Sequence, residues 1–304
     1  MREIIYLTKR NCRVFLRDKA AVFFSFLSML IILGLMVVFL GKMNSDELIS
    51  VLAEYGGERD TVQDQKNATY LIQLWTLAGI LVVNSVTVTL TVMGTMVQDE
   101  TRKRIMAFYV TSVNRIKLSL GYILSSWLVG TGMCVITLAV GELYFVLQGH
   151  GLLAAVELFK LVGLIALSAF TFSALGYLLA LFVHSDSAWS GILTIIGTLV
   201  GFAGGIYLPL SSLSETVQKV LKCIPVLPGA AMMREVCTAQ AIRETFDGLP
   251  EAVADGFKER MGITLYRGEV QIELWQQVTL LLIYAIIAIV VATLVNRKRK
   301  LKDR

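Results

Sequence analysis

The stretch LIQLWTLAGILVVNSVTVTLTVMGTMVQDETRKR, residues 71–104, contains the feature that decides the fold. Residues 71–97 carry no charged side chain, whereas residues 98–104 include two acids and three bases. An α-helix needs about 20 apolar residues to cross the roughly 30 Å hydrocarbon core of a membrane. The first part is therefore predicted to span a membrane, and the charged part is predicted to lie in water at one end of that span.

The composition of the whole chain agrees with this prediction. The 304 residues are 56% hydrophobic and 17% charged, and the mean hydropathy is +0.69. A soluble domain is normally about one-quarter charged. The sequence therefore predicts an all-α integral membrane protein, with residues 1–304 forming a single transmembrane domain. The basic residues lie beside apolar runs, so lipid headgroups explain the net charge of +5 better than nucleic acid does. The four cysteines and two histidines have no zinc-site spacing, and no metal site is expected.

Six apolar stretches are long enough to form transmembrane helices. They cover residues 22–41, 71–97, 118–147, 158–183, 188–208 and 274–295. With six spans, the N-terminal segment, the loop 98–117 and the C-terminal tail lie on one side, and together they hold 17 of the 28 lysine and arginine residues. The positive-inside rule places these segments, and both termini, in the cytoplasm. Residues 42–70 and 209–272 are then expected outside the cell.

Residues 2–20 are predicted to form a helix on the inner membrane surface. Its apolar face would contain Ile5, Cys12, Phe15 and Leu16, and its cationic flank would contain Arg10, Arg13 and Arg17. A simple anchor for the first span explains much of the same pattern.

The loop after the second span combines charge with a helical apolar pattern. Ile105, Phe108, Tyr109 and Ser112 recur on one face of a helix, behind a charged first turn. Such a helix suits docking into a groove of a cytosolic partner. The alternative is an interfacial loop that only orients the protein.

This loop resembles the cytosolic loop after the second span of ABC type-2 export permeases. The family's order is an acidic residue, a basic residue and Gly-Thr-Leu, followed by Thr-Pro-Val-Ser/Asn-Arg. Matching positions here are Asp99, Ile105, Thr111, Val113, Asn114 and Arg115. The chain departs from the pattern where Lys103-Arg104 replaces Gly-Thr and where Ser112 replaces Pro, so the start of the helix is expected to have a different shape.

A second resemblance lies at residues 204–236. The family has a Gly-x-x-x-Pro followed by hydroxyl residues, an amphipathic turn, a proline and an arginine. Matching residues are Gly205, Pro209, Ser211, Ser212, Pro225 and Arg234. The resemblance implies short re-entrant helices at the outer leaflet, and the prolines fit, because proline interrupts helices.

The resemblance implies a transport function rather than an enzymatic one. The chain would be the permease subunit of an ATP-driven exporter in a bacterial cell membrane, paired with a second permease copy or a sister chain. ATP and Mg²⁺ would be bound by cytosolic ATPase partners, since the chain has no phosphate-loop motif of its own. The loop would be a coupling helix that transmits ATPase closure, through Asp99, Glu100, Arg102, Ile105, Phe108, Tyr109 and Arg115. An amphipathic cargo is expected: a drug, antibiotic, peptide or lipid-like molecule.

Two polar or small-residue patterns within the spans have open interpretations. Gly197, Gly201 and Gly205 form overlapping Gly-x-x-x-Gly units, which favour close helix packing within one chain or between two copies. Asn84, Thr87, Thr91 and Thr95 follow one helix face and would either line a substrate path or bond to neighbouring helices.

Several isolated residues also invite functional hypotheses. Glu142 is an acid within a span, with Lys160 as a possible ion-pair partner. Cys223 and Cys237 lie in the outer segment, where a disulfide is possible.

Three other functions compete with the leading one. The first is an exporter of lipid-linked polysaccharide. The second is a membrane-embedded enzyme using the cluster His184–Ser187, which lies in a short turn. The third is an ATP-independent channel, which would leave both resemblances unexplained.

Overall fold

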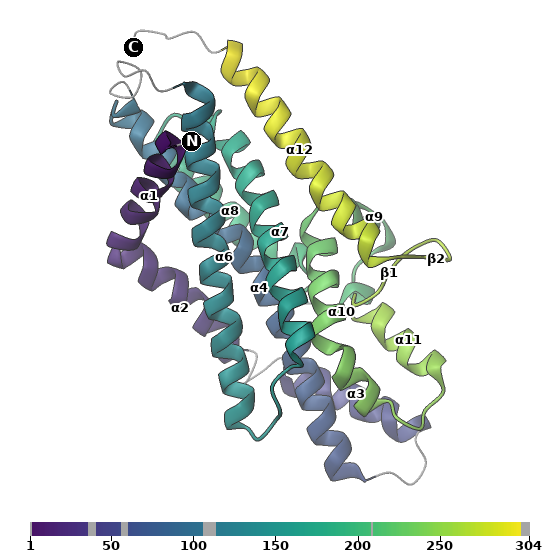
Figure 1. The fold of residues 1–304 in the computed structure, drawn as a ribbon. Helices are drawn as coiled ribbons and strands as arrows, with labels where there is room; N and C mark the ends of the chain where they lie inside the picture. The colour runs from purple at the N-terminus through teal and green to yellow at the C-terminus, as the bar shows by residue number, and fades with distance from the viewer. Residues whose placement is uncertain (1, 36–40, 56–59, 106–113, 208, 299–304) are drawn as a thin grey trace.

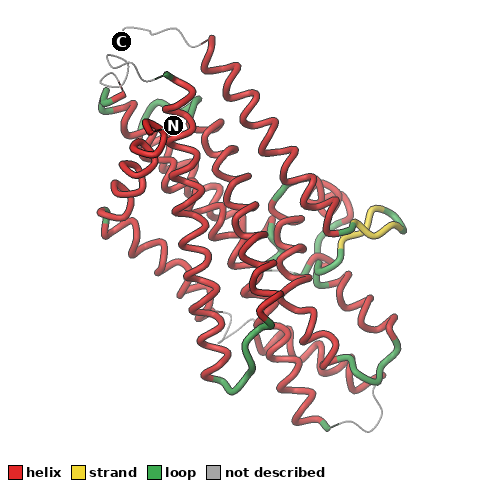
Figure 2. Tube along the Cα trace, in the orientation of Figure 1, coloured by secondary structure: helices red, strands yellow, loops and turns green. Residues whose placement is uncertain are grey.

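The computed structural model describes residues 2–35, 41–55, 60–105, 114–207 and 209–298. Figure 1 and Figure 2 show a bundle of long helices with shorter helices and one hairpin at the side. The helices are α1 (Arg2–Arg17), α2 (Lys19–Leu35), α3 (Gly41–Tyr55), α4 (Thr61–Thr101), α6 (Arg115–Leu147), α7 (Ala155–Ala180), α8 (Asp186–Ala203), η2 (Leu210–Ser212), α9 (Glu215–Cys223), α10 (Val226–Thr245), α11 (Glu251–Arg260) and α12 (Leu274–Lys298). The strands are β1 (Leu265–Arg267) and β2 (Val270–Ile272).

Helix α4 is the centre of the bundle. It contacts α3, α6, α7, α8 and α10, and 89% of its most apolar stretch is buried, compared with 22% for α12 and 17% for α8. Its 41 residues correspond to a length of about 60 Å at 1.5 Å per residue. The apolar part of the quoted stretch, residues 71–97, therefore forms the core of the protein, and the Thr61 end of α4 extends beyond the thickness of a membrane.

Five described helices are long and apolar enough to cross a membrane: α4, α6, α7, α8 and α12. Five of the six predicted spans therefore have a helix of sufficient length and apolar composition. Most of the ends agree within about five residues, but α4 begins ten residues before the predicted span at 71. The sixth prediction, 22–41, falls on α2, which has 17 described residues. Because residues 36–40 lie outside the described part of the chain, the count of six spans stays a prediction.

The described parts of the segments predicted to share one side of the membrane lie at one end of the bundle. We call this the loop end, because the chain between Thr101 and Asn114 connects α4 to α6 there (Figure 1). Arg115 Nη1 donates to the Asn296 carbonyl of α12 at 3.3 Å, and Lys117 Nζ lies 2.9 Å from Glu3 Oε2 of α1. The charge pattern therefore predicted the grouping of these three segments.

Helix α1 packs on α6 and leaves part of its predicted apolar face exposed. Leu7, Thr8, Asn11 and Phe15 are buried. Of the predicted apolar face, Phe15 is buried, Cys12 is half-buried, and Ile5 and Leu16 are exposed. A helix on a membrane surface would present exposed apolar side chains to lipid, so the interfacial position of α1 stays a prediction.

The segment after α8 contains the chain's four prolines, each at or near the start of a helix. Pro209, Pro225 and Pro250 immediately precede η2, α10 and α11, and Pro228 lies in the first turn of α10, where the missing N–H has no helical partner to lose. A two-stranded antiparallel hairpin follows, with Arg267 paired to Val270 around Gly268 (φ +67°). This hairpin is a small correction to the all-α prediction.

Candidate functional site

The end of α4 carries a buried carboxylate that connects three helices at the loop end. Asp99 is 1% exposed. Arg10 of α1 donates through Nη1 to Asp99 Oδ2, and through Nη2 to Oδ1 at 2.9 Å. The Tyr122 hydroxyl of α6 donates to Oδ2 at 2.8 Å, and Arg104 Nη1 lies 3.9 Å from Oδ1. We call Arg10, Asp99 and Tyr122 the Asp99 cluster.

The Asp99 cluster is a charge-assisted network with a buried carboxylate and a partly exposed arginine. The fork of the guanidinium matches the two carboxylate oxygens, which gives the strong bidentate form of this interaction. The hydrogen bond and the charge of Asp99 raise the pKa of Arg10, against the opposing effect of burial. Asp99 was expected among the residues that couple to the ATPase, but its side chain faces inward. In the described structure Asp99 holds α4 to α1 and α6, and a role of this residue in coupling stays a prediction.

The turn between α7 and α8 is attached to the same end of α4. His184 Nδ1 lies 3.4 Å from Glu100 Oε1, and Thr101 Oγ1 donates to the His184 carbonyl at 3.5 Å. Ser185 Oγ accepts the Ala188 N–H and caps α8. The His184–Ser187 cluster therefore connects helices, and its histidine faces Glu100 instead of a serine, which argues against the enzyme alternative.

Helix α4 ends with a residue in an unusual backbone conformation. Arg102 is its C-cap, and the next residue, Lys103, has φ +56°, the only positive φ of a non-glycine residue in the described chain. A left-handed residue after the C-cap is usually glycine, since a Cβ there is strained. Lys103 occupies the position at which the family pattern has glycine. The chain therefore has the left-handed conformation that ends the helix, but not the glycine that favours it.

Replacing Lys103 with glycine is expected to stabilise the protein. Glycine removes the strain of the left-handed conformation, but it also gives the unfolded chain more conformational freedom. The net increase in the free energy of unfolding should be about 0.5–1 kcal/mol. Thermal unfolding in detergent measures the change. Lys103→Ala is the matched control, because it removes the same side chain and keeps the Cβ. Equal melting temperatures for the two variants would contradict the strain argument.

The other predicted coupling residues have different settings. Glu100 and Ile105 are half-buried, and Arg102 is exposed. Phe108 and Tyr109 lie outside the described residues. Arg115 begins α6 beside Asn114, whose side-chain oxygen accepts the Ile116 N–H at 3.1 Å and caps the helix. The Asn-Arg pair of the loop motif therefore starts α6 and connects it to α12 through the Arg115–Asn296 bond.

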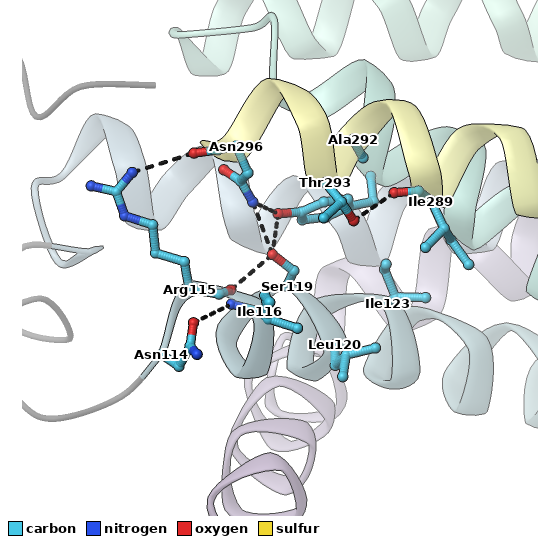
Figure 3. A pocket seen from close by; sticks show the side chains of 11 residues that line it. Asn114, Arg115, Ile116, Ser119, Leu120, Ile123, Ile289, Ala292, Thr293 and Asn296 are labelled. Carbon is cyan, nitrogen blue, oxygen red and sulfur yellow. Dashed lines mark hydrogen bonds between the residues drawn. The ribbon is translucent and has the colours of Figure 1, made fainter. Parts of the chain in front are cut away.

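A second polar cluster joins α6, α7 and α12 at the loop end. Ser119 Oγ and the Tyr177 hydroxyl lie 2.5 Å apart, and Asn296 Nδ2 donates to Ser119 Oγ at 3.0 Å and to the Tyr177 oxygen at 2.7 Å. Figure 3 shows Asn296 and Ser119 facing each other beside a cavity of about 330 Å³. The cavity lies between the first turns of α6 and the last turns of α12.

At the opposite end of the bundle, a buried arginine connects α10 with the end of α8. Arg234 is 1% exposed, and its Nη2 donates to the carbonyls of Gly204 and Gly205 at 2.8 and 3.0 Å. Its guanidinium carbon lies 4.2 Å from the centre of the Trp75 ring of α4. The carbonyls at a helix C-terminus lack helical donors and carry partial negative charge. Arg234 therefore caps α8 and holds α10 against it, an arrangement that we call the Arg234 latch.

The structure brings together some residues of the second resemblance and separates others. Gly205 and Arg234 meet in the latch. Pro209 lines a small cavity with Glu47 and Arg260, and Pro225 starts α10. Gly205 adopts φ +63° and lies beyond α8, which ends at Ala203, because a left-handed residue cannot continue the helix. The predicted span to 208 is therefore too long.

The three glycines of the Gly-x-x-x-Gly pattern do not share one role. A Cβ on Gly201 would lie 2.3 Å from Cε2 of Tyr207, so this glycine accommodates a ring of the same chain. The Gly205 carbonyl binds Arg234. A Cβ on Gly197 would have no described atom within 4 Å. Gly201 and Gly205 are thus used within the chain, and Gly197 alone keeps an open face.

The polar stripe of α4 is largely engaged in hydrogen bonds. Asn84 Nδ2 donates to Thr137 Oγ1 of α6 at 3.1 Å. Thr87 and Thr91 donate to carbonyls of α4 itself, and Thr95 is buried. Contacts between helices explain Asn84 in this single chain, and the lining of a path by these residues stays a prediction.

Three further predicted residues have clear positions. Glu142 is buried, and its Oε2 accepts the Leu153 N–H at 3.1 Å; Lys160 is exposed on α7 and is not among the described contacts of Glu142. Cys223 is exposed, Cys237 is buried, and both are free thiols. The possible disulfide is therefore absent from the described structure.

Sequence reasoning missed the residues that complete these clusters. Tyr122, Tyr177, Asn296 and Trp75 lie far along the chain from their partners, and each looks like an ordinary residue of an apolar helix. Arg10 was assigned to the cationic flank of the surface helix, with no partner in the bundle. The available signal was that Asp99 follows a long apolar run, where an acid needs a partner.

Comparison with known protein families agrees with this architecture. The profile described as ABC-2 family transporter protein matches residues 57–294, which include α4 through most of α12. Comparison with curated individual proteins gives no match. The matched region covers more than half of the chain. It contains the loop, the helices α4 and α6 that carry the two polar clusters, and the Arg234 latch. The chain is a multi-pass membrane protein that belongs to the ABC-2 family of transporter permeases.

Proposed function

We propose that this chain is the permease subunit of an ATP-driven exporter, with the loop end in the cytoplasm and the 102–113 segment docked on an ATPase partner. The observation that carries the proposal is the attachment of the end of α4. Arg10 of α1, Tyr122 of α6 and His184 of the α7–α8 turn all bind Asp99 or Glu100. A displacement of the loop would therefore reach four structural segments at once.

A second copy of the permease fits the exposed side of α8. Ile195, Leu199 and Phe202 are exposed there, and Gly197 leaves open space. We infer that a partner permease, as a homodimer or a sister chain, covers this face and that the translocation path lies between the two copies. An amphipathic cargo moving outward fits a path bounded by apolar helices; lipid-linked polysaccharide is the alternative cargo.

The test of the proposed function is co-expression with an ABC-type ATPase subunit from the same genome. A stable complex and an ATPase activity stimulated by the permease are expected in nanodiscs. Phe108→Ala with Tyr109→Ala should weaken association or abolish the stimulation, because these side chains are predicted to fill the groove of the partner. Purification yield and the rate of ATP hydrolysis are the measurements.

Phe159→Ala is the matched control for this double variant. Phe159 is an exposed aromatic residue near the start of α7, at the opposite end of the bundle. Its replacement should leave association and stimulation unchanged. Two results would remove the support for the 102–113 segment as the docking site. One is an equal loss of association or stimulation in the Phe159 variant and in the Phe108/Tyr109 variant, and the other is unchanged association and stimulation in the Phe108/Tyr109 variant.

The proposed orientation predicts the thiol reactivity of Cys223. This residue is exposed at the end of α9, whereas Cys134 and Cys237 are buried. A maleimide that cannot cross membranes should label intact cells expressing the protein, and Cys223→Ser should abolish the label. Labelling that appears only after the membrane is opened would reverse the assigned orientation.

A further inference from the structure

The cavity between α6 and α12 has a polar end and an apolar side. Helices α6 and α12 both pack on α7. At the loop end Arg115 Nη1 donates to the Asn296 carbonyl, and Asn296 Nδ2 donates to Ser119 Oγ. The described lining residues are Asn114, Arg115, Ile116, Ser119, Leu120, Ile123, Tyr177, Ile289, Ala292, Thr293 and Asn296. Its polar members are gathered toward the ends of the two helices in Figure 3, and Ile123 and Ile289 lie deeper along them.

The charge of this lining has one sign. Among the described residues that line the cavity, Arg115 alone carries a formal charge. Its Nη1 donates to the Asn296 carbonyl, which holds the guanidinium group at the polar end of the cavity. The described lining therefore presents a cationic side chain at that end.

The position of the cavity places it where lipid headgroups meet acyl chains. It lies at the ends of two helices that are apolar enough to span a membrane. Beside it, Ile116 is 49% exposed, and Ile286, Val290 and Leu294 form an exposed apolar stripe on α12. A volume of about 330 Å³ is at the lower end of the range for small-molecule pockets, so it suits a headgroup phosphate and the first part of an acyl chain.

We propose that this cavity binds an anionic phospholipid, with its phosphate beside Arg115 and Asn296 and its acyl chain along Leu120 and Ile289. Guanidinium groups pair strongly with phosphate oxygens. Because Arg115 directly follows the loop and contacts α12, a bound lipid would hold α6 and α12 together next to the coupling segment. The lipid belongs to the inner leaflet if the proposed orientation holds, whereas the site itself does not depend on the ATPase.

The test is native mass spectrometry of the full-length protein in a neutral detergent, titrated with phosphatidylglycerol or phosphatidylcholine. Phosphatidylglycerol should bind more tightly. Arg115→Gln should weaken its binding about tenfold or more, since hydrogen bonds to charged groups contribute about 1.5–3 kcal/mol. Leu120→Trp should weaken the binding of both lipids by filling the apolar part, and size-exclusion chromatography verifies that this variant is folded.

Lys117→Gln is the matched control. Lys117 lies two residues from Arg115 on the same helix, pairs with Glu3 and does not line the cavity, so its loss should leave the tight binding of phosphatidylglycerol unchanged. Equal weakening by Lys117→Gln and Arg115→Gln would show a diffuse electrostatic effect and overturn the site. Displacement of the lipid by inorganic phosphate at similar concentrations would show a plain anion site and overturn the lipid assignment. Neither readout uses an ATPase, so failure here is distinct from failure of the proposed function.

Discussion

Replacement of Asp99 by asparagine is expected to lower the free energy of unfolding by about 2–4 kcal/mol. Breaking a buried ion pair leaves an uncompensated charge, which typically costs about 3–5 kcal/mol. The effect should fall somewhat below that range, because Arg10 is 32% exposed while Asp99 is 1% exposed. The side-chain oxygen of asparagine can still accept the hydrogen bond from the Tyr122 hydroxyl. The variant therefore removes the charge of Asp99 and keeps the shape of its side chain. Thermal and denaturant unfolding in detergent provide the measurement.

A double-mutant cycle makes this prediction specific to the Arg10–Asp99 pair. Arg10→Met with Asp99→Asn should destabilise the protein by less than the sum of the single variants, since the double variant leaves no unpaired charge. The control cycle is Glu3→Gln with Lys117→Gln, an exposed pair that joins α1 to α6 at 2.9 Å. Its coupling should be about 1 kcal/mol or less. Additive effects in the Arg10–Asp99 cycle would contradict the predicted role of the Asp99 cluster.

Arg234→Met should destabilise the protein to a similar extent, at the opposite end of the bundle. Methionine keeps an apolar stem, but the carbonyls of Gly204 and Gly205 lose their buried donor and Trp75 loses its cation. Unsatisfied buried groups cost about 1–3 kcal/mol each, and a desolvated cation–π contact adds up to about 2 kcal/mol. We expect a loss of about 2–4 kcal/mol and weaker protection of the Gly204–Ile206 amides in hydrogen exchange.

Arg234→Lys and Arg243→Met define the specificity of the latch. Lysine keeps the charge but lacks the planar fork, so it should recover only part of the stability. Arg243 is exposed on the same helix, α10, and its replacement should change the stability by about 0.5 kcal/mol or less. If Arg234→Met resembled Arg243→Met, the Arg234 latch would have no structural role.

Prediction from the sequence succeeded for features that depend on the composition of a single helix. The spans at 71–97, 118–147, 158–183 and 274–295 have their counterparts in α4, α6, α7 and α12, because hydropathy depends on a single segment and the thickness of the membrane. Prediction was poorer for Arg10 and for Gly205. In both, a partner from another segment decides the outcome: the Asp99 carboxylate for Arg10, and the Arg234 guanidinium for the carbonyls after α8.

The sequence by itself determined the class of protein, the long spans, the grouping of the basic segments at one end and the position of the loop. These features follow from local composition and from the free-energy cost of placing charge in hydrocarbon. Only the tertiary structure decided that Asp99 is buried between α1 and α6, that Arg234 caps α8, and that a cavity separates α6 from α12. Each of these depends on contacts between residues far apart in the chain, and a polar residue in an apolar helix does not by itself reveal which distant group satisfies it.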